Sequence, residues 1–340
     1  MINTFLPPMR PELVVCANAR CGASERIGIH SHQERRYICH SCGQTFAETK
    51  GTPLYGLKYP LWQVVIVLTL LAFGCPVPAI VAAFGVDERT VATWQSKAGQ
   101  HAKALHEHVV GQGQVDLGQV QADELYVKTQ CGTVWVATAI SVFSRLFLWG
   151  AIAPQRNEKL VTQVVAHVRR CAKPGQPILW AVDGFQAWTT AVLKVFRDPQ
   201  HTGRPGRPRL LMWPDLHIVQ VVKQYSQRHI SGIERRLRHG CLARAQAIML
   251  MTQVGWGLIN TAYVERFNAT WRTWLPALTR RSRTPARDTA HLEAALFWTG
   301  GVYNFCRIHA TLDGTPAMAA DLTDHVWSID EFLRYRVRRE

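Results

Sequence analysis

Hydrophobic spacing predicts a helical segment that precedes a segment of mixed strands and helices. Residues 61–73 and 77–84 have apolar positions at helical intervals, and a third helix is predicted from residue 90 to about 108. Gly74 ends the first of these helices. A turn over 85–87 joins the second helix to the third, and Asp87 is a suitable N-cap for the third. We therefore expect a helical unit over residues 58–110.

From residue 115 the pattern changes to strands rich in Val, Ala and Ile. A meander of three strands is predicted over 120–127, 133–142 and 146–152. A helix, a short buried strand and a second helix follow over 158–172, 177–182 and 188–196. The order β-β-β-α-β-α occurs in ribonuclease H-like cores. The predicted fold class is α/β, with such a core over residues 115–320.

Four of the nine cysteines cluster near the N-terminus. They form a C-x4-C pair and a C-x2-C pair with 17 residues between the pairs: Cys16 and Cys21, then Cys39 and Cys42. Two knuckles at this separation are typical of a structural zinc ribbon, here residues 10–50. Gly22 and Gly43 follow the two pairs, where a knuckle turn needs a positive φ. A nearby histidine as substitute ligand is the alternative, and the candidates are His30, His32 and His40.

Composition narrows the class of protein. The 340 residues are 47% hydrophobic, which excludes a disordered chain, and 39 Lys+Arg against 24 Asp+Glu give a net charge of +15. That charge favours a polyanionic partner. The longest apolar run, 61–73, is too short to span a membrane, and the N-terminus lacks a signal-peptide layout. Five scattered single cysteines fit a reducing compartment, so we expect a soluble cytoplasmic protein without membrane contact.

The two helices around the 85–87 turn have the layout of a DNA-binding helix-turn-helix. Arg89 and Thr93 on the second of these helices are candidates for contacts with DNA. An ordinary α-hairpin is the alternative. The upstream cysteine cluster and the basic charge favour DNA binding.

Three separated acidic residues form a candidate catalytic set. Asp123 lies on the first predicted strand, Asp183 at the end of the fourth, and Glu265 on a later helix with Arg272 seven residues further on. Carboxylates from adjacent strands can hold two Mg²⁺ or Mn²⁺ ions for phosphoryl transfer. Glu124 is the alternative to Asp123, and Glu234 is the alternative to Glu265.

Together these features resemble the DDE transposases of bacterial insertion sequences. The resemblance covers about residues 12–320 and includes a block with Tyr303, Asn304, Arg307 and His309, followed by Thr315-Pro316. It implies that Asp123, Asp183 and Glu265 are the magnesium ligands and that Arg272 contacts a DNA phosphate. The four residues of the later block are either packing residues or supports of the site.

Positive charge is concentrated between residues 197 and 287, which carry 16 basic and four acidic residues, a net of +12. Such density favours contact with a DNA backbone, although a solvated basic face is the alternative. The candidate contacts are Arg204, Arg207, Arg209, Arg235, Arg236, Arg280 and Arg281. Residues 197–262 are interpreted as an insertion in the core, and 321–340 as a basic C-terminal tail.

The leading hypothesis is a DNA transposase that cuts the ends of an insertion sequence and joins the resulting 3′-hydroxyls to target DNA. Its partners would be the terminal repeats and the target DNA, and we expect at least a homodimer. A DNA-binding regulator with an inactive core and a ribonuclease H-like nuclease without strand transfer are the alternatives.

Overall fold

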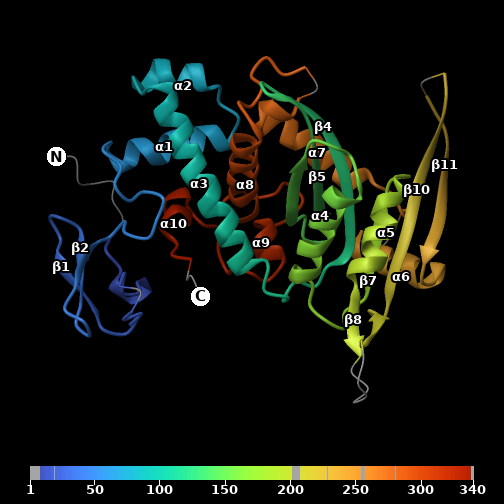
Figure 1. Cartoon of the computed structure of the whole chain (residues 1–340), viewed down its shortest axis with the longest axis horizontal. Coiled ribbons are helices and arrows are strands. Elements are labelled where there is room, and N and C mark those ends of the chain that lie inside the picture. The colour runs from blue at the N-terminus through green and yellow to red at the C-terminus, as the bar shows by residue number, and fades with distance from the viewer. Residues whose placement is uncertain are drawn as a thin grey trace.

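A six-stranded mixed sheet forms the centre of this α/β protein, with a small three-stranded unit and a helical unit on the N-terminal side (Figure 1). The computed structural model describes residues 8–18, 20–200, 207–227, 229–253, 257–279 and 281–337. Arg204 and Arg280, two of the predicted DNA contacts, lie outside these residues. In the described part of the chain, no helix is both long and apolar enough to cross a membrane.

The N-terminal unit is a small antiparallel sheet. After a 3-10 helix at Pro11–Leu13 come β1 (Ile27–Ser31), β2 (Arg36–Cys39) and β3 (Thr45–Ala47), in the order β1-β2-β3. Its core contains few side chains, among them buried Tyr37 and Phe46. A core of this size rarely folds without a further constraint.

The helical unit matches the sequence prediction closely. It consists of α1 (Leu61–Ala72), α2 (Val77–Phe84) and α3 (Glu88–Val109). Gly85 ends α2 in the left-handed conformation, at φ 62°. Asp87 caps α3, because its side chain accepts a hydrogen bond of 2.9 Å from the backbone N–H of Arg89. The predicted turn and N-cap are therefore confirmed.

The central sheet begins with the predicted meander. Its strands are β4 (Gly118–Thr129), β5 (Gly132–Ser141), β6 (Phe147–Ala153), β7 (Ile178–Val182), β10 (Leu216–Ser226) and β11 (His229–His239). They are ordered β11-β10-β7-β4-β5-β6. Strand β7 runs parallel to both β4 and β10, whereas the other neighbouring strands pair antiparallel.

Helices cover both faces of the sheet. On one face, α4 (Glu158–Cys171) buries its apolar stripe against β5 and β6 and packs against α5 (Gln186–Val195). On the other face lie α6 (Leu242–Thr252) and α7 (Ala262–Trp274). A 3-10 turn at Pro276–Leu278 follows α7, and α8 (Thr289–Phe305) packs between α3 and β6. Helix α8 thereby joins the helical unit to the sheet.

Part of the expected insertion, residues 197–262, belongs to the sheet itself. Strand β10 pairs with β7 over Leu216–Gln220, and the β10–β11 hairpin continues beyond that pairing as the long arm in Figure 1. The remaining strands of the stretch, β8 (Arg197–Gln200) and β9 (Arg209–Met212), form a separate two-stranded sheet. The hydrophobic first half of β10 explains its place, because Leu216, Ile218 and Val219 are fully buried.

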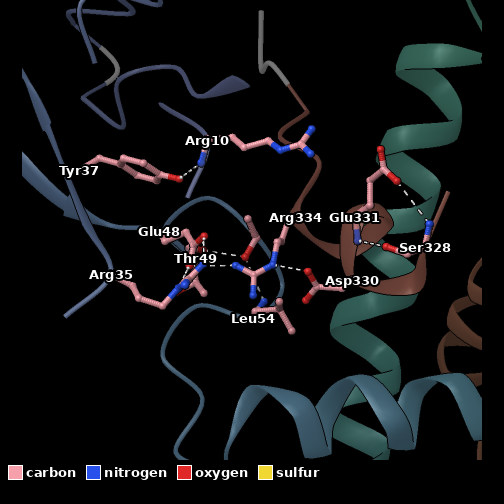
Figure 2. Close-up of polar contacts among 11 residues, drawn as sticks. Arg10, Arg35, Tyr37, Glu48, Thr49, Leu54, Ser328, Asp330, Glu331 and Arg334 are labelled. Carbon is pink, nitrogen blue, oxygen red and sulfur yellow. Dashed lines mark hydrogen bonds and ion pairs between the residues drawn. The ribbon is translucent and has the colours of Figure 1, made fainter. Parts of the chain in front are cut away.

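The C-terminal segment packs against the rest of the protein up to residue 337. After α9 (Pro316–Ala319), α10 (Ile329–Arg334) buries Phe332 and Leu333. Figure 2 shows Arg334 between Asp330 of its own helix and Glu48 of the N-terminal unit, at 2.6 and 3.0 Å. The guanidinium of Arg336 donates to the backbone carbonyls of Val15 and Glu48. These arginines lie in the predicted basic C-terminal tail and connect it to the N-terminal unit.

Candidate functional site

The register of β4 and β7 brings two of the predicted acids together. Val182, the last residue of β7, pairs with Ala122 of β4, so the next residues, Asp183 and Asp123, lie side by side. Helix α7 packs over β4 and contributes Glu265 and Arg272. All four side chains line one cavity of about 510 Å³. Positions 142 residues apart in the sequence therefore share one site.

Polar side chains on α7 and beside it hold these acids in place. Asn268 donates to Asp123 Oδ2 at 2.9 Å and accepts from Thr138 Oγ1 at 3.2 Å. Thr261 Oγ1 donates to Glu265 Oε1 at 2.6 Å, and Lys223 of β10 forms an ion pair with the same carboxylate. The buried amide of Asn268 thus links strand β4, strand β5 and helix α7.

Glu124 is a further acid of the site. Its side chain points to the sheet face opposite Asp123 and is fully buried. Carboxylate oxygens of Asp123, Glu124 and Asp183 nevertheless lie within 4.8 Å of one another. Arg156 Nη2 donates to Glu124 Oε2 at 3.0 Å, while Glu124 Oε1 has no hydrogen-bond partner among the described residues. A buried, unpartnered carboxylate oxygen beside two other acids fits a cation-binding site.

Burial and mutual repulsion raise the pKa values of these acids. Burial, with the negative charge of Asp183, raises the pKa of Glu124 to about 7. Burial also raises the pKa of Asp123, and the charges of Asp183 and Glu265 act in the same direction. The cluster therefore carries more negative charge than its protein partners compensate, which a bound divalent cation would relieve.

The raised pKa of Glu124 predicts a pH-dependent loss of stability. Between about pH 4.5 and pH 7 the folded protein retains the Glu124 proton and the unfolded chain does not, so the free energy of unfolding falls as pH rises. Relative to Glu124→Gln, the wild type should lose about 3 kcal/mol over this range in buffer without added divalent ions. Urea unfolding at pH 5 and pH 8 measures the difference.

The matched control for this pH prediction is Glu293→Gln, which removes an exposed carboxylate paired with Lys103. Its difference from the wild type should change little with pH. Equal pH dependence of wild type and Glu124→Gln would show that Glu124 is ionised throughout.

Glu234, the alternative to Glu265, lies elsewhere. It is an exposed residue on the edge strand β11 and forms an ion pair of 2.6 Å with Arg236. It does not line the cavity that contains Asp123, Asp183 and Glu265. Among these two glutamates, geometry therefore favours Glu265 as the third acid.

The predicted DNA-contacting residues differ in whether their side chains already have partners within the protein. Arg272 is half-buried at the cavity, and its Nε has no hydrogen-bond partner among the described residues. Arg235 donates to the carbonyl of Ile259 at 2.7 Å, and Arg236 pairs with Glu234. Besides Arg236, the exposed residues among the candidates are Arg89, Thr93, Arg207, Arg209 and Arg281. Arg89 and Thr93 are four residues apart on α3 and share one solvent-facing side of that helix.

The four N-terminal cysteines converge as the spacing predicts. The Sγ atoms of Cys16 and Cys42 lie 3.6 Å apart, and those of Cys21 and Cys39 lie 3.8 Å apart. All four sulfurs are within 4.8 Å of one another. Tetrahedral zinc with Zn–S bonds of about 2.3 Å requires sulfur separations of about 3.8 Å. The knuckle glycines Gly22 and Gly43 have φ of 58° and 73°. These positions fit a structural zinc site with four thiolates.

Substitution of one ligand tests the zinc site. Cys39→Ser should lower bound zinc from about one atom per chain to near zero, because three thiolates do not close a structural site. Elemental analysis of the purified protein measures the zinc content. Cys75→Ser, which changes a lone half-buried cysteine, is the control. Equal zinc content in both variants would contradict the assignment.

The block around Tyr303 has a packing role. Tyr303 OH donates to the carbonyl of Arg145, and Asn304 makes two hydrogen bonds of 2.9 Å with the backbone of Phe147. The guanidinium of Arg307 lies 3.3 Å from the ring centre of Trp274 and 3.8 Å from that of Phe73. His309 Nδ1 accepts from the backbone N–H of Thr311. These contacts join α8 to β6, α7 and α1, and none reaches an acid of the cavity.

Sequence reasoning missed three residues of the site. Asn268 follows Glu265 by three positions, so helical spacing already indicated that the two share a face. Arg156 and Lys223 gave no comparable signal. Arg156 lies in the loop between β6 and α4, and Lys223 on β10, and only the tertiary structure brings them to the acids.

Comparison with protein-family models and with curated proteins gives no match for this chain. The side chains and their geometry are therefore the basis for a functional proposal.

Proposed function

We propose that the chain is a metal-dependent DNA transposase with a ribonuclease H-like core. The observation that supports this most is that Asp123, Asp183, Glu265 and Arg272 line a single cavity. Asp123 lies on β4, Asp183 directly follows β7, and Glu265 and Arg272 lie on α7. A cavity that combines several carboxylates with a guanidinium that has no ion-pair partner among the described residues suits a substrate that carries phosphates and reacts at a metal site.

The strand order supports the inferred core. In the order β10-β7-β4-β5-β6, the three strands of the meander lie on one side and two later strands are added next to the first. Of these five strands, only β5 runs antiparallel to β4. This agrees with the β-β-β-α-β-α order and with the neighbouring first and fourth strands expected for a ribonuclease H-like sheet. Strand β11 is an addition at the edge.

The proposed chemistry has two steps at phosphorus. In the first, a water oxygen bonds to phosphorus as the P–O3′ bond breaks, and the departing oxygen takes up a proton to become a 3′-hydroxyl. In the second, that 3′-oxygen loses its proton and bonds to a phosphorus of the target DNA, whose own P–O3′ bond breaks. Two Mg²⁺ or Mn²⁺ ions held by Asp123, Asp183 and Glu265 would activate the attacking oxygen and stabilise the leaving one. Arg272 would bind a non-bridging phosphate oxygen.

The N-terminal units would bind the ends of the element. A zinc-stabilised ribbon precedes the helical unit, and α3 exposes Arg89 and Thr93 on one side. A helix that follows a tight turn and presents such side chains can enter the major groove. Because two DNA ends have to be joined to one target, we propose that at least two protomers act together.

The test is a joining reaction with DNA that contains this gene and its flanking sequence, since the ends of an insertion sequence lie beside its gene. Purified protein, Mg²⁺ and a target plasmid should give covalently joined products. Cleavage without joining would instead support a nuclease, and a mobility shift without cleavage would support a regulator. Either result would overturn the transposase proposal.

A further inference from the structure

Basic side chains of the protein occupy the acidic site from two sides. Arg156 Nη2 lies 3.0 Å from Glu124 Oε2 and 3.2 Å from Asp183 Oδ2, so a single nitrogen bridges two carboxylates. On the other side, Lys223 forms an ion pair with Glu265. The acidic partners are therefore Glu124, Asp183 and Glu265, and the last two are proposed above to hold a metal ion.

The bridging position of Arg156 is one that a cation would take. The carboxylate oxygens of Asp123, Glu124 and Asp183 lie within 4.8 Å of one another, and the guanidinium lies between two of these acids. A divalent ion and a guanidinium at such distances from the same carboxylates repel each other strongly. Both cannot occupy the site with the geometry seen here.

The guanidinium of Arg156 also has access to a second position, away from the carboxylates. Its side chain is 35% exposed and extends from the short loop between β6, which ends at Ala153, and α4, which begins at Glu158. Its guanidinium rests on the ring of Phe185, 4.2 Å from the ring centre. A rotation of this long side chain would move the charge from the carboxylates toward solvent or toward a bound phosphate.

We propose that Arg156 is an exchangeable counter-ion of the acidic site. It neutralises Glu124 and Asp183 in the absence of metal, leaves them when a divalent ion binds, and then contacts a DNA phosphate. Lys223 has the same relation to Glu265. This inference rests on the proposed function for the identity of the polyanion, and it makes Arg156 a positioning residue that couples metal binding to DNA binding.

The coupling has a thermodynamic consequence. A metal ion that binds the acids has to displace Arg156. This displacement lowers the metal affinity as long as no other group binds the guanidinium. A DNA phosphate that binds the displaced guanidinium offsets this loss of affinity. DNA should therefore tighten metal binding, and metal should tighten DNA binding, by the same factor.

The experiment is a titration of the zinc-loaded full chain with Mn²⁺, followed by calorimetry and by the electron paramagnetic resonance signal of free Mn²⁺. Arg156→Gln should bind Mn²⁺ at least about tenfold more tightly than the wild type when DNA is absent. A short duplex should then tighten Mn²⁺ binding to the wild type more than to Arg156→Gln. Arg156→Lys, which keeps the charge, should resemble the wild type.

Lys159→Gln is the matched control, because it removes an exposed positive charge three residues away on α4. It should leave Mn²⁺ affinity within about twofold. Circular dichroism and thermal unfolding establish that each variant is folded. A folded Arg156→Gln that binds Mn²⁺ no more tightly than Lys159→Gln would overturn the inference.

The two proposals fail in different ways. If the wild type joins DNA ends while Arg156→Gln leaves Mn²⁺ affinity unchanged, the proposed function stands and the counter-ion role is wrong. If neither protein binds Mn²⁺ at the acidic site, with or without the duplex, both proposals are wrong.

Discussion

Asp183→Asn should reduce DNA cleavage and joining by on the order of 10³-fold or more, with DNA binding retained. The substitution preserves the shape of the side chain and can keep the hydrogen bond from the backbone N–H of Phe185. It removes one negative charge from a site in which carboxylate oxygens of Asp123, Glu124 and Asp183 lie within 4.8 Å of one another. Single-turnover cleavage of end-containing DNA measures the loss, and a mobility shift measures binding.

Asp198→Asn is the control for this prediction. Asp198 lies on β8, its side chain is 60% exposed and pairs with Arg169, and it is not among the residues that line the cavity. Its cleavage rate should stay within about twofold of the wild type. Full cleavage activity in Asp183→Asn would remove this residue from the proposed set of metal ligands.

Asp123→Asn and Glu265→Gln should behave like Asp183→Asn if the three acids act as one unit, and their combinations should be far from additive. Glu124 is a distinct case. Its fully buried side chain pairs with Arg156 and with no second basic group among the described contacts. Its loss should change metal affinity and pH dependence more than it changes the shape of the site.

Local patterns were sufficient to predict most of the helices and strands. The turn at Gly85 and the N-cap at Asp87 depend on neighbours within a few residues, and the sequence contains that information. The cysteine knuckles are similar, because C-x4-C and C-x2-C spacing fixes two ligands locally and the metal needs only to join two such pairs.

The remaining features depend on tertiary contacts. Strand β10 is predicted as part of an insertion, and the second half of the strand is polar. Its position beside β7 results from pairing and burial in the folded sheet, which local sequence does not reveal. Arg334 and Arg336 are predicted only as part of a basic C-terminal tail, because their acceptor Glu48 lies some 290 residues earlier in the chain. Sequence spacing contains no information about such pairs.

Fewer of the basic side chains are therefore available for DNA binding than the sequence indicates. Arg244 is paired with Asp215 and Arg236 with Glu234, and both lie in the stretch with the highest density of basic residues. Arg272, in contrast, faces the cavity and its Nε has no partner among the described residues. If the proposed function is right, Arg272→Gln should therefore weaken DNA binding more than Arg244→Gln does.

Asn304→Leu should lower the free energy of unfolding by about 2–6 kcal/mol without changing metal affinity. Asn304 is fully buried on α8, accepts from the N–H of Phe147 and donates to its carbonyl, each at 2.9 Å. Phe147 begins β6, the edge strand of the sheet, so no further strand can satisfy these backbone groups. Leucine fills a similar volume and leaves both groups buried without a partner. Urea unfolding of the zinc-loaded protein measures the loss.

Asn157→Leu is the reference variant against which the stability loss of Asn304→Leu is compared. Asn157 caps α4 through one hydrogen bond of 3.1 Å from the N–H of Leu160, so its loss should cost about 1 kcal/mol. Mn²⁺ titration at a temperature where all variants are folded separates the two roles left open for Asn304. Unchanged stability with weakened Mn²⁺ binding would show that Asn304 supports the acidic site and not the packing of β6. The expected result is the reverse, because its two hydrogen bonds end on the backbone of Phe147 and not on any acid of the cavity.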